Sequence, residues 1–432
     1  MTSVVLIQIS VLLLLGVFAF FYRYRTVGEV PLDDIGIFWI LFFVLYTTLP
    51  GLFWLLQGGE YLVINKRLYN LGTTPEDMVY LLNISWIYLA FFILGFYCLP
   101  KSGNLKSPIQ RQDIKNSLMF AALVVIFINA SINIFFGSFS IIPKADSYAE
   151  SYAIGNNLPL GIRQISKIFS GFDFTAWIII NIGLFQKYKK TKLLILILAL
   201  IFLILNIGGA RSPLFFYFFI LLVLRHIFVS PISLRFFIFT GIASIALFLL
   251  LGIVRGLSGD ILITGVGEFD MLWGNAVELL HKKQDSGIDV PLSIRFSDFF
   301  GFIPSQLLWF EKSTLSVWFM QEFYPIYIEL GVGFSFGIIS EIIIGNGYID
   351  AIWRGFLLGL ICSALMKFFQ RESCPWWFLP FQLLLLVNIV LSIRDTSFRL
   401  IIDSLQIYLP SLLFIYILSR ILLVPFMLKH KN

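Results

Sequence analysis

The 432-residue sequence contains only three histidines and three cysteines. Cys98, Cys362 and Cys374 have no paired spacing and lie in or beside apolar runs, which argues against a disulfide framework or a metal site. Three histidines also leave haem, zinc and histidine-nucleophile chemistry without most of their ligands. The sequence has neither a GxxxxGKS/T phosphate-binding loop nor an HExxH pair. We therefore expect no metal, no cofactor and no direct use of nucleoside triphosphates.

Charged residues are also scarce, at 13%, whereas 59% of the residues are hydrophobic and the mean hydropathy is +0.90. So much apolar surface does not fit inside a water-soluble core, so lipid must be the solvent. Runs of about 18 or more apolar residues, each long enough to cross a bilayer as a helix, recur along the chain. We predict one all-α, polytopic membrane domain over residues 1–432. Its spans are expected at about 2–22, 35–56, 79–99, 117–136, 168–185, 193–209, 212–229, 236–254, 351–369, 376–393 and 400–424.

Basic residues set the predicted orientation. The first apolar run lacks basic residues ahead of it and is followed by Arg23 and Arg25, so we interpret it as a retained helix with an outward N-terminus. With eleven spans, the other basic connections also face the cytoplasm. These connections are 101–115, 187–192, 225–235, 367–371 and 420–431. The net charge of +6 thus reflects membrane topology, and no nucleic-acid partner is expected.

A long segment of mixed polarity, 255–350, separates the eighth and ninth spans, and we expect it to form a large extracytoplasmic loop. Within it, the stretch 331–347 is apolar enough to be a twelfth span. Its glycines and central Glu341 fit poorly with a lipid-facing helix, so a re-entrant or broken helix that lines a cavity is favoured. The sequence therefore predicts eleven spans, or twelve if this segment crosses.

Basic residues of membrane proteins are usually concentrated on the cytoplasmic side, but four arginines here are expected at the outer ends of spans. Arg211 lies in GGARSP, Arg255 in IVRG, and Arg394 and Arg399 in SIRDTSFR. A cation at or near the depth of the membrane needs an anionic or hydrogen-bonding partner. A guanidinium keeps its charge and offers five donors in a flat fork, which suits the oxygens of a diphosphate. We expect these arginines to form an anion-binding cradle.

The alternative is that each arginine only locks helices together through a nearby carboxylate, such as Arg394 with Asp395 or Arg399 with Asp403. Carboxylates near these arginines are also the candidate general bases. Glu341 is the strongest candidate, because an acid in an apolar stretch is costly unless it is used or paired. A structural hydrogen bond to helix ends is its other explanation. Further candidates are Asp395, Glu268 and Asp270.

Five elements occur in a distinctive order: GGAR at 208–211, RG at 255–256, RFSDFFGFIPS at 295–305, the glycine-rich stretch around Glu341 at 333–347, and RDTSFR at 394–399. This ordered set resembles the Wzy-type O-antigen and enterobacterial common antigen polymerases. The resemblance covers the second half of the chain, and the first half only as a hydropathy profile.

The resemblance implies a multi-pass glycosyltransferase of the bacterial inner membrane. It would transfer a growing glycan from undecaprenyl diphosphate to the non-reducing end of a new lipid-linked repeat unit on the periplasmic face, without a metal or cofactor. Glu341 and Asp395 are then the candidate catalytic residues. Arg295, which with Asp298 is expected to fix the large loop over the site, joins the diphosphate-binding group of Arg211, Arg255, Arg394 and Arg399. By analogy its partners are lipid-linked oligosaccharides, membrane lipid and a chain-length regulator.

Two other functions share this layout. A flippase or transporter of lipid-linked sugars would also use arginines in a polytopic body, but such proteins often have repeated halves, and none is detected here. An O-antigen ligase would use the same donor lipid. Ligases usually offer a histidine in the large outer loop, and His281 keeps that alternative open.

Overall fold

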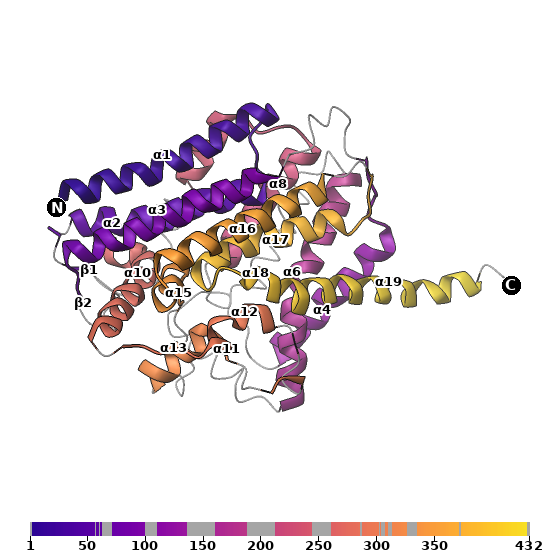
Figure 1. Ribbon diagram of the computed structural model, residues 1–432. Helices are drawn as coiled ribbons and strands as arrows, with labels where there is room; N and C mark the ends of the chain where they lie inside the picture. The colour runs from indigo at the N-terminus through magenta and orange to yellow at the C-terminus, as the bar shows by residue number, and fades with distance from the viewer. Residues whose placement is uncertain are drawn as a thin grey trace. The chain divides into compact units, whose positions relative to one another are not determined.

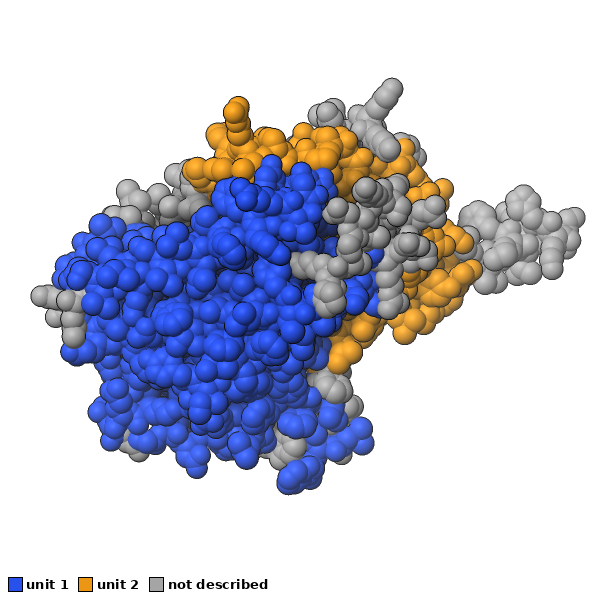
Figure 2. All heavy atoms as spheres, turned by 45° about the horizontal axis from the view of Figure 1, so that its top comes forward, with its two compact units in different colours: residues 1–106, 252–370, 386–402 blue, residues 107–251, 371–385, 403–432 orange. Residues whose placement is uncertain are grey.

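The structure is a computed structural model. It describes residues 2–56, 58–59, 61–62, 71–99, 110–135, 160–187, 212–243, 261–285, 287–301, 303, 307–309, 313–325, 335–370 and 373–429. Most of them are helical, and the strands are four two-residue segments, so the predicted all-helical fold is confirmed. The chain forms two compact units, shown in different colours in Figure 2. Unit 1 comprises residues 1–106, 252–370 and 386–402, and unit 2 the remainder.

Unit 1 holds the N-terminal helices and most of the segment that we expect to be the large loop (Figure 1). Its elements are α1 (Thr2–Val27), α2 (Ile35–Leu56), β1 (Tyr61–Leu62), β2 (Leu71–Gly72), α3 (Pro75–Cys98), α10 (Ile261–Asp285), α11 (Leu292–Arg295), α12 (Ser297–Phe300), α13 (Leu315–Phe323), α15 (Ile338–Ile344) and α16 (Tyr348–Phe369). The second half of α17 (Phe378–Arg394) and most of α18 (Arg399–Asp403) complete it.

Polar residues at the helix starts of unit 1 satisfy backbone groups that the helices leave free. At α3, Thr74 and Asp77 form a reciprocal capping box, with Pro75 in the first turn. At α2, the buried Asp34 accepts hydrogen bonds from the first amides of the helix. Its other oxygen forms an ion pair of 2.6 Å with Arg23 Nε of α1. This ion pair fixes the turn between the first two helices.

Glycines allow α3 and α16 to pack closely along their length (Figure 1). Gly355 and Gly359 of α16 form a GxxxG pair. A Cβ at Gly355 would lie 2.5 Å from the carbonyl oxygen of Tyr88, and one at Gly359 would lie 2.1 Å from that of Phe92. The two backbones are thus in direct contact, as is typical of helix pairs in membranes.

Unit 2 is built mainly of the middle and C-terminal helices. Its elements are β3 (Gln110–Arg111), α4 (Asn116–Phe135), α6 (Leu160–Lys187), α8 (Ser212–Phe228), a helix at Leu234–Ala243, β4 (Ser373–Cys374), the first half of α17, the π-helix η2 (Ser404–Tyr408) and α19 (Leu409–Lys429). Helix α6 packs against α4 and α8, and α19 packs against α4. The strands β3 and β4 pair in parallel.

Five helical segments in the described part of the chain are long and apolar enough to cross a membrane. They are Thr2–Val27, Ile35–Leu56, Pro75–Cys98, Tyr348–Phe369 and Arg399–Leu422. Each coincides with a predicted span. The expected spans at 117–136, 212–229 and 376–393 correspond to shorter apolar helices, whereas 193–209 lies outside the described residues. The chain is therefore an α-helical membrane protein, and the number of eleven or twelve spans stays a prediction.

The segment predicted to re-enter the membrane contains a short, broken helix. The seven residues of α15 are too few to cross a bilayer. A turn at 345–347, with Gly347 at a φ of 60°, separates α15 from α16. Residues 331–334 lie outside the described part, and membrane re-entry stays a prediction.

We predict that Gly359→Ala destabilises the protein by about 1–3 kcal/mol, because its methyl group must push the α3 backbone away. The midpoint of thermal unfolding of the full chain, purified in detergent, measures the effect. Gly241→Ala is the matched control, since a Cβ there would meet no described atom within 4 Å. Equal midpoints for the two variants would contradict the proposed close packing.

Candidate functional site

Glu341 lies at the centre of a buried polar network in unit 1. It is 2% exposed, and both of its carboxylate oxygens accept hydrogen bonds. Oε1 accepts one from Arg354 Nη1 at 2.5 Å. Oε2 accepts two from Ser397, at 2.9 Å from the amide nitrogen and 2.6 Å from the hydroxyl. A carboxylate removed from water requires such partners.

Arg354 of α16 is the principal partner of Glu341 and is 1% exposed. Its Nε lies 3.5 Å from Asp350 Oδ2, and its Nη2 donates to the carbonyl oxygen of Arg295 at 3.3 Å. The guanidinium also lies over the ring of Trp353, 4.6 Å from the centroid. Acids and aromatic rings thus enclose this cation, which gives it a structural role.

Sequence reasoning missed Arg354 and Asp350, although a signal was present. The two residues are four positions apart, on one face at the start of an apolar helix. Arg354 lies inside the expected span 351–369 and Asp350 directly precedes it, and an ionisable residue inside a span is a candidate site by default.

Asp350 also joins Arg295 to the network. Its Oδ2 lies 3.2 Å from Arg295 Nη2, and its Oδ1 accepts a hydrogen bond from the indole nitrogen of Trp353 at 3.0 Å. A Cβ at Gly345 would lie only 1.8 Å from the same Oδ2, so this position requires glycine. The glycines that follow Glu341 therefore allow Asp350 to reach the network.

Lys283 of α10 holds the C-terminal end of α15. Its Nζ donates to the carbonyl oxygens of Ile343 at 2.6 Å and Gly345 at 2.7 Å, where the partial negative charge of the helix lies. Burial, and secondly the charge of Arg295, lower the pKa of the Lys283 ammonium.

The loop 395–398, between α17 and α18, is fixed by two acids. Glu341 holds Ser397, as described above. Asp298 accepts hydrogen bonds from Thr396 Oγ1 at 2.8 Å and from the amide nitrogen of Phe398 at 3.3 Å. Burial, and secondly the charge of Glu341, raise the pKa of Asp298 to about 7. We name this segment the anchored loop.

The anchored loop and the two residues that flank it carry three of the predicted site residues. Arg394 Nη2 donates to Ser335 Oγ at 3.2 Å, and the Arg394 carbonyl accepts from the Gly337 amide at 3.0 Å. Arg399 Nη1 pairs with Asp395 Oδ2 at 3.1 Å, so a nearby carboxylate does neutralise this arginine, as the helix-locking alternative expects. The side chains of Arg399 and Asp395 remain 33% and 27% exposed, and that of Arg295 remains 17% exposed. These groups are accessible to a ligand, whereas Glu341 is enclosed.

The structure thus connects Glu341, Arg295, Arg394, Asp395 and Arg399 in unit 1 through the anchored loop, α15 and α16. The partly exposed guanidinium of Arg399 lies beside the partly exposed carboxylate of Asp395, and the loop between them is held by Glu341 and Asp298. Such a site can bind an anion with several oxygens and can accept a proton. The predicted Arg211 and Arg255 lie outside the described residues.

Other candidates lie elsewhere in the structure. His281 of α10, on which the ligase alternative rests, lies 2.9 Å from Asp77 Oδ2 through its Nε2. Glu268 and Asp270 lie within α10. Across the described ranges, no three His, Cys, Asp or Glu side chains are grouped so as to hold a metal ion.

Comparison with known proteins adds no relative. No family model matches the sequence, and neither a curated protein nor a solved structure is significantly similar to it. The geometry of the site and the ordered motifs are therefore the basis for the functional proposal.

We predict that Arg354→Met destabilises the protein by about 3–5 kcal/mol, because it leaves Glu341 buried without its cation. Adding Glu341→Gln should restore part of this loss, with a coupling free energy of about 0.5–3 kcal/mol. Thermal unfolding of the wild type, both single variants and the double variant in detergent gives the coupling. Simple additivity of the two effects would show that the pair is not coupled.

A second prediction concerns pH. An acid whose pKa is higher in the folded protein than in the unfolded chain reduces stability as pH rises between the two values. For Asp298 these values are 3.8 and about 7. Asp298→Asn stays neutral, so its unfolding midpoint should rise relative to that of the wild type as the pH increases from about 4 to about 7. Asp289→Asn removes an exposed carboxyl nine residues earlier in the chain and serves as the control. If the difference in unfolding midpoint between Asp298→Asn and the wild type did not change with pH, the raised pKa of Asp298 would be contradicted.

Proposed function

We propose that this protein is an integral-membrane glycosyltransferase that polymerises lipid-linked O-antigen-type repeat units. The donor would be a glycan on undecaprenyl diphosphate, and the acceptor a new lipid-linked repeat unit at the periplasmic face of the inner membrane. The observation that carries the proposal is the anchored loop, which Glu341 and Asp298 hold in place and which carries the ion pair of Asp395 with Arg399. Arg394 directly precedes this loop in the chain. The ordered motifs described from the sequence include the same residues.

The chemistry requires a group that accepts a proton and cations that stabilise a leaving diphosphate. The acceptor hydroxyl oxygen forms a bond to the anomeric carbon of the donor glycan while the bond from that carbon to the diphosphate breaks. Undecaprenyl diphosphate leaves with the electron pair, and the hydroxyl proton passes to a carboxylate. Asp395 suits this role because it is partly exposed and adjoins the arginines. Arg295, Arg394 and Arg399 would bind the diphosphate oxygens, with Arg211 and Arg255 as further candidates.

For Glu341 the geometry supports a positioning role. Its oxygens are occupied by Arg354 and Ser397, and it is buried, so an acceptor hydroxyl has no free oxygen to approach. By holding Ser397 it fixes the loop that carries Asp395. Its use as a base stays a prediction from the sequence.

Deletion of the gene tests the proposal. We expect loss of long-chain polysaccharide with retention of single repeat units on the cell surface, measured on a lipopolysaccharide gel. Loss of a flippase or a ligase would remove the single repeats as well. A gel without single repeats would therefore overturn the polymerase assignment in favour of one of those two functions.

Complementation with site variants tests the residues within the same experiment. Asp395→Asn should lower polymerisation by about 10²–10⁴-fold if Asp395 is the base. Single replacements of Arg211, Arg255, Arg394 or Arg399 by alanine should each abolish long chains. Arg25→Ala, which removes an exposed arginine at the end of α1, should leave the ladder unchanged. Normal ladders from the site variants, at wild-type protein levels, would refute the arginine cradle.

A further inference from the structure

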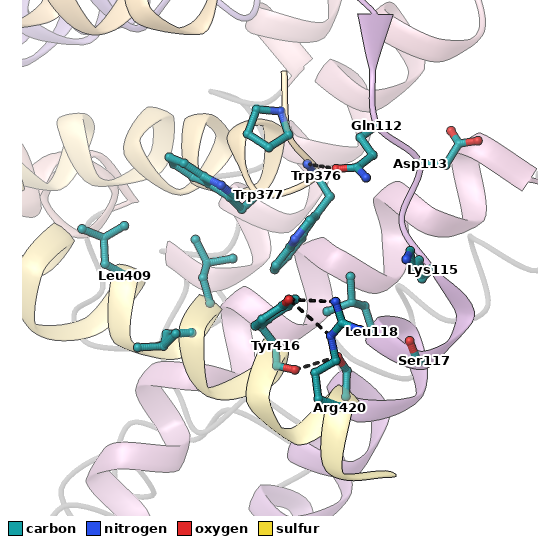
Figure 3. A pocket seen from close by; sticks show the side chains of 14 residues that line it. Gln112, Asp113, Lys115, Ser117, Leu118, Trp376, Trp377, Leu409, Tyr416 and Arg420 are labelled. Atoms are coloured by element: carbon teal, nitrogen blue, oxygen red, sulfur yellow. Dashed lines mark hydrogen bonds between the residues drawn. The ribbon is translucent and has the colours of Figure 1, made fainter. Parts of the chain in front are cut away.

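Unit 2 contains a pocket of about 560 Å³ along one face of α19. It lies where the starts of α4 and α17 and the first half of α19 come together (Figure 3). All of its lining residues belong to unit 2. None of them belongs to the site described above, so the pocket needs a separate explanation.

Backbone pairing holds the walls of the pocket in place. The parallel pair β3 and β4 aligns the segment before α4 with the segment before α17. The Gln112 amide donates to the carbonyl oxygen of Cys374 at 3.1 Å, and the Gln112 side-chain oxygen accepts from the Trp376 amide at 3.4 Å. The pocket is therefore part of the ordered framework of unit 2.

One end of the pocket is polar and positively charged. Lys115, Ser117 and Arg420 lie together at this end (Figure 3). Arg420 donates through Nε and Nη2 to the Tyr416 hydroxyl, at 3.2 and 2.9 Å, which leaves the other donors of its fork for a ligand. The first amides of α4, at Asn116 and Ser117, add the positive end of a 20-residue helix.

The charge balance at this end favours an anion. Asp113 also lines the pocket, so Lys115 and Arg420 against Asp113 leave a formal charge of +1. Across the described ranges, neither Lys115 nor Arg420 forms an ion pair with a carboxylate. Both cations line the pocket and are solvent-exposed residues.

The other end of the pocket is apolar. Leu409, Leu412 and Leu413 line it, and Leu409 lies at the far end from Arg420 (Figure 3). The eleven helical steps from Leu409 to Arg420 span about 16 Å. Between the two ends, the ring of Trp376 stacks on that of Tyr416, with centroids 6.0 Å apart. Aromatic residues of this kind are typical of the boundary between lipid headgroups and acyl chains.

We propose that this pocket binds an anionic phospholipid. Its phosphodiester would lie between Lys115, Arg420 and the start of α4, and an acyl chain would lie along the leucines of α19. A soluble anion would use only the charged end and would leave the leucine-lined groove exposed, whereas an amphiphile fits both ends. Basic pockets at the ends of membrane helices recognise lipid headgroups in this way. The site is independent of glycan transfer.

Lipid binding to the purified full chain tests the proposal. The protein is prepared in a neutral detergent with phosphatidylglycerol or phosphatidylcholine, and native mass spectrometry measures the lipid retained. We expect preferential retention of phosphatidylglycerol. The double variant Lys115→Gln, Arg420→Gln should retain it about tenfold less well, since two charge-assisted contacts are lost. Arg235→Gln, which removes an exposed cation of unit 2 outside the pocket, should retain it like the wild type.

Two further arms separate a lipid site from a phosphate site. Leu409→Trp, which narrows the apolar end without a change of charge, should also weaken retention, and excess inorganic phosphate should not displace the lipid. Displacement by phosphate, or retention that depends only on charge, would overturn the lipid assignment. Equal retention of both lipids by the wild type would do the same. The unfolding midpoint in phosphatidylcholine shows that each variant is folded, and none of these readouts depends on polymer synthesis.

Discussion

The buried pair of Glu341 and Arg354 is the interaction on which the arrangement of unit 1 depends. Both groups are almost fully removed from water, so each is tolerated only because the other is present. The pair also joins three parts of the chain. Glu341 lies on α15 and Arg354 on α16, and the second oxygen of Glu341 holds Ser397 in the anchored loop. Substitution of either Glu341 or Arg354 is therefore expected to disturb the anchored loop and the exposed residues that it carries.

Glycines make room for this polar network between apolar helices. Gly345 admits the carboxylate of Asp350, while Gly355 and Gly359 bring the backbone of α16 against α3. From α3, Tyr88 in turn donates to the Ser397 hydroxyl at 3.1 Å. In lipid, where the hydrophobic effect does not favour contact between helices, such close packing and internal hydrogen bonds hold helices together. The same contacts that stabilise unit 1 thus fix the anchored loop.

The two units offer different environments to anionic ligands. In unit 1 the partly exposed arginines adjoin acids, so a diphosphate there would compete with existing ion pairs such as that of Arg399 with Asp395. In unit 2 the cations of the pocket have no such acid partners among the described residues, and an apolar groove continues from them. The site in unit 1 therefore suits a substrate that binds, reacts and dissociates. The pocket in unit 2 suits a lipid that remains bound.

The sequence by itself determined the membrane character and the helical class, because the scarcity of charge and the apolar runs leave no other solvent or backbone structure. It also identified Glu341, Arg295 and the residues around Asp395 as unusual for an apolar chain. Only the tertiary structure showed that Glu341 pairs with Arg354 and that Arg399 pairs with Asp395. Partners that lie far apart in the sequence, such as Glu341 and Ser397 or Asp298 and Phe398, are brought together by helix packing. No local pattern of residues encodes that packing, because it depends on which glycines of α16 meet which carbonyl groups of α3.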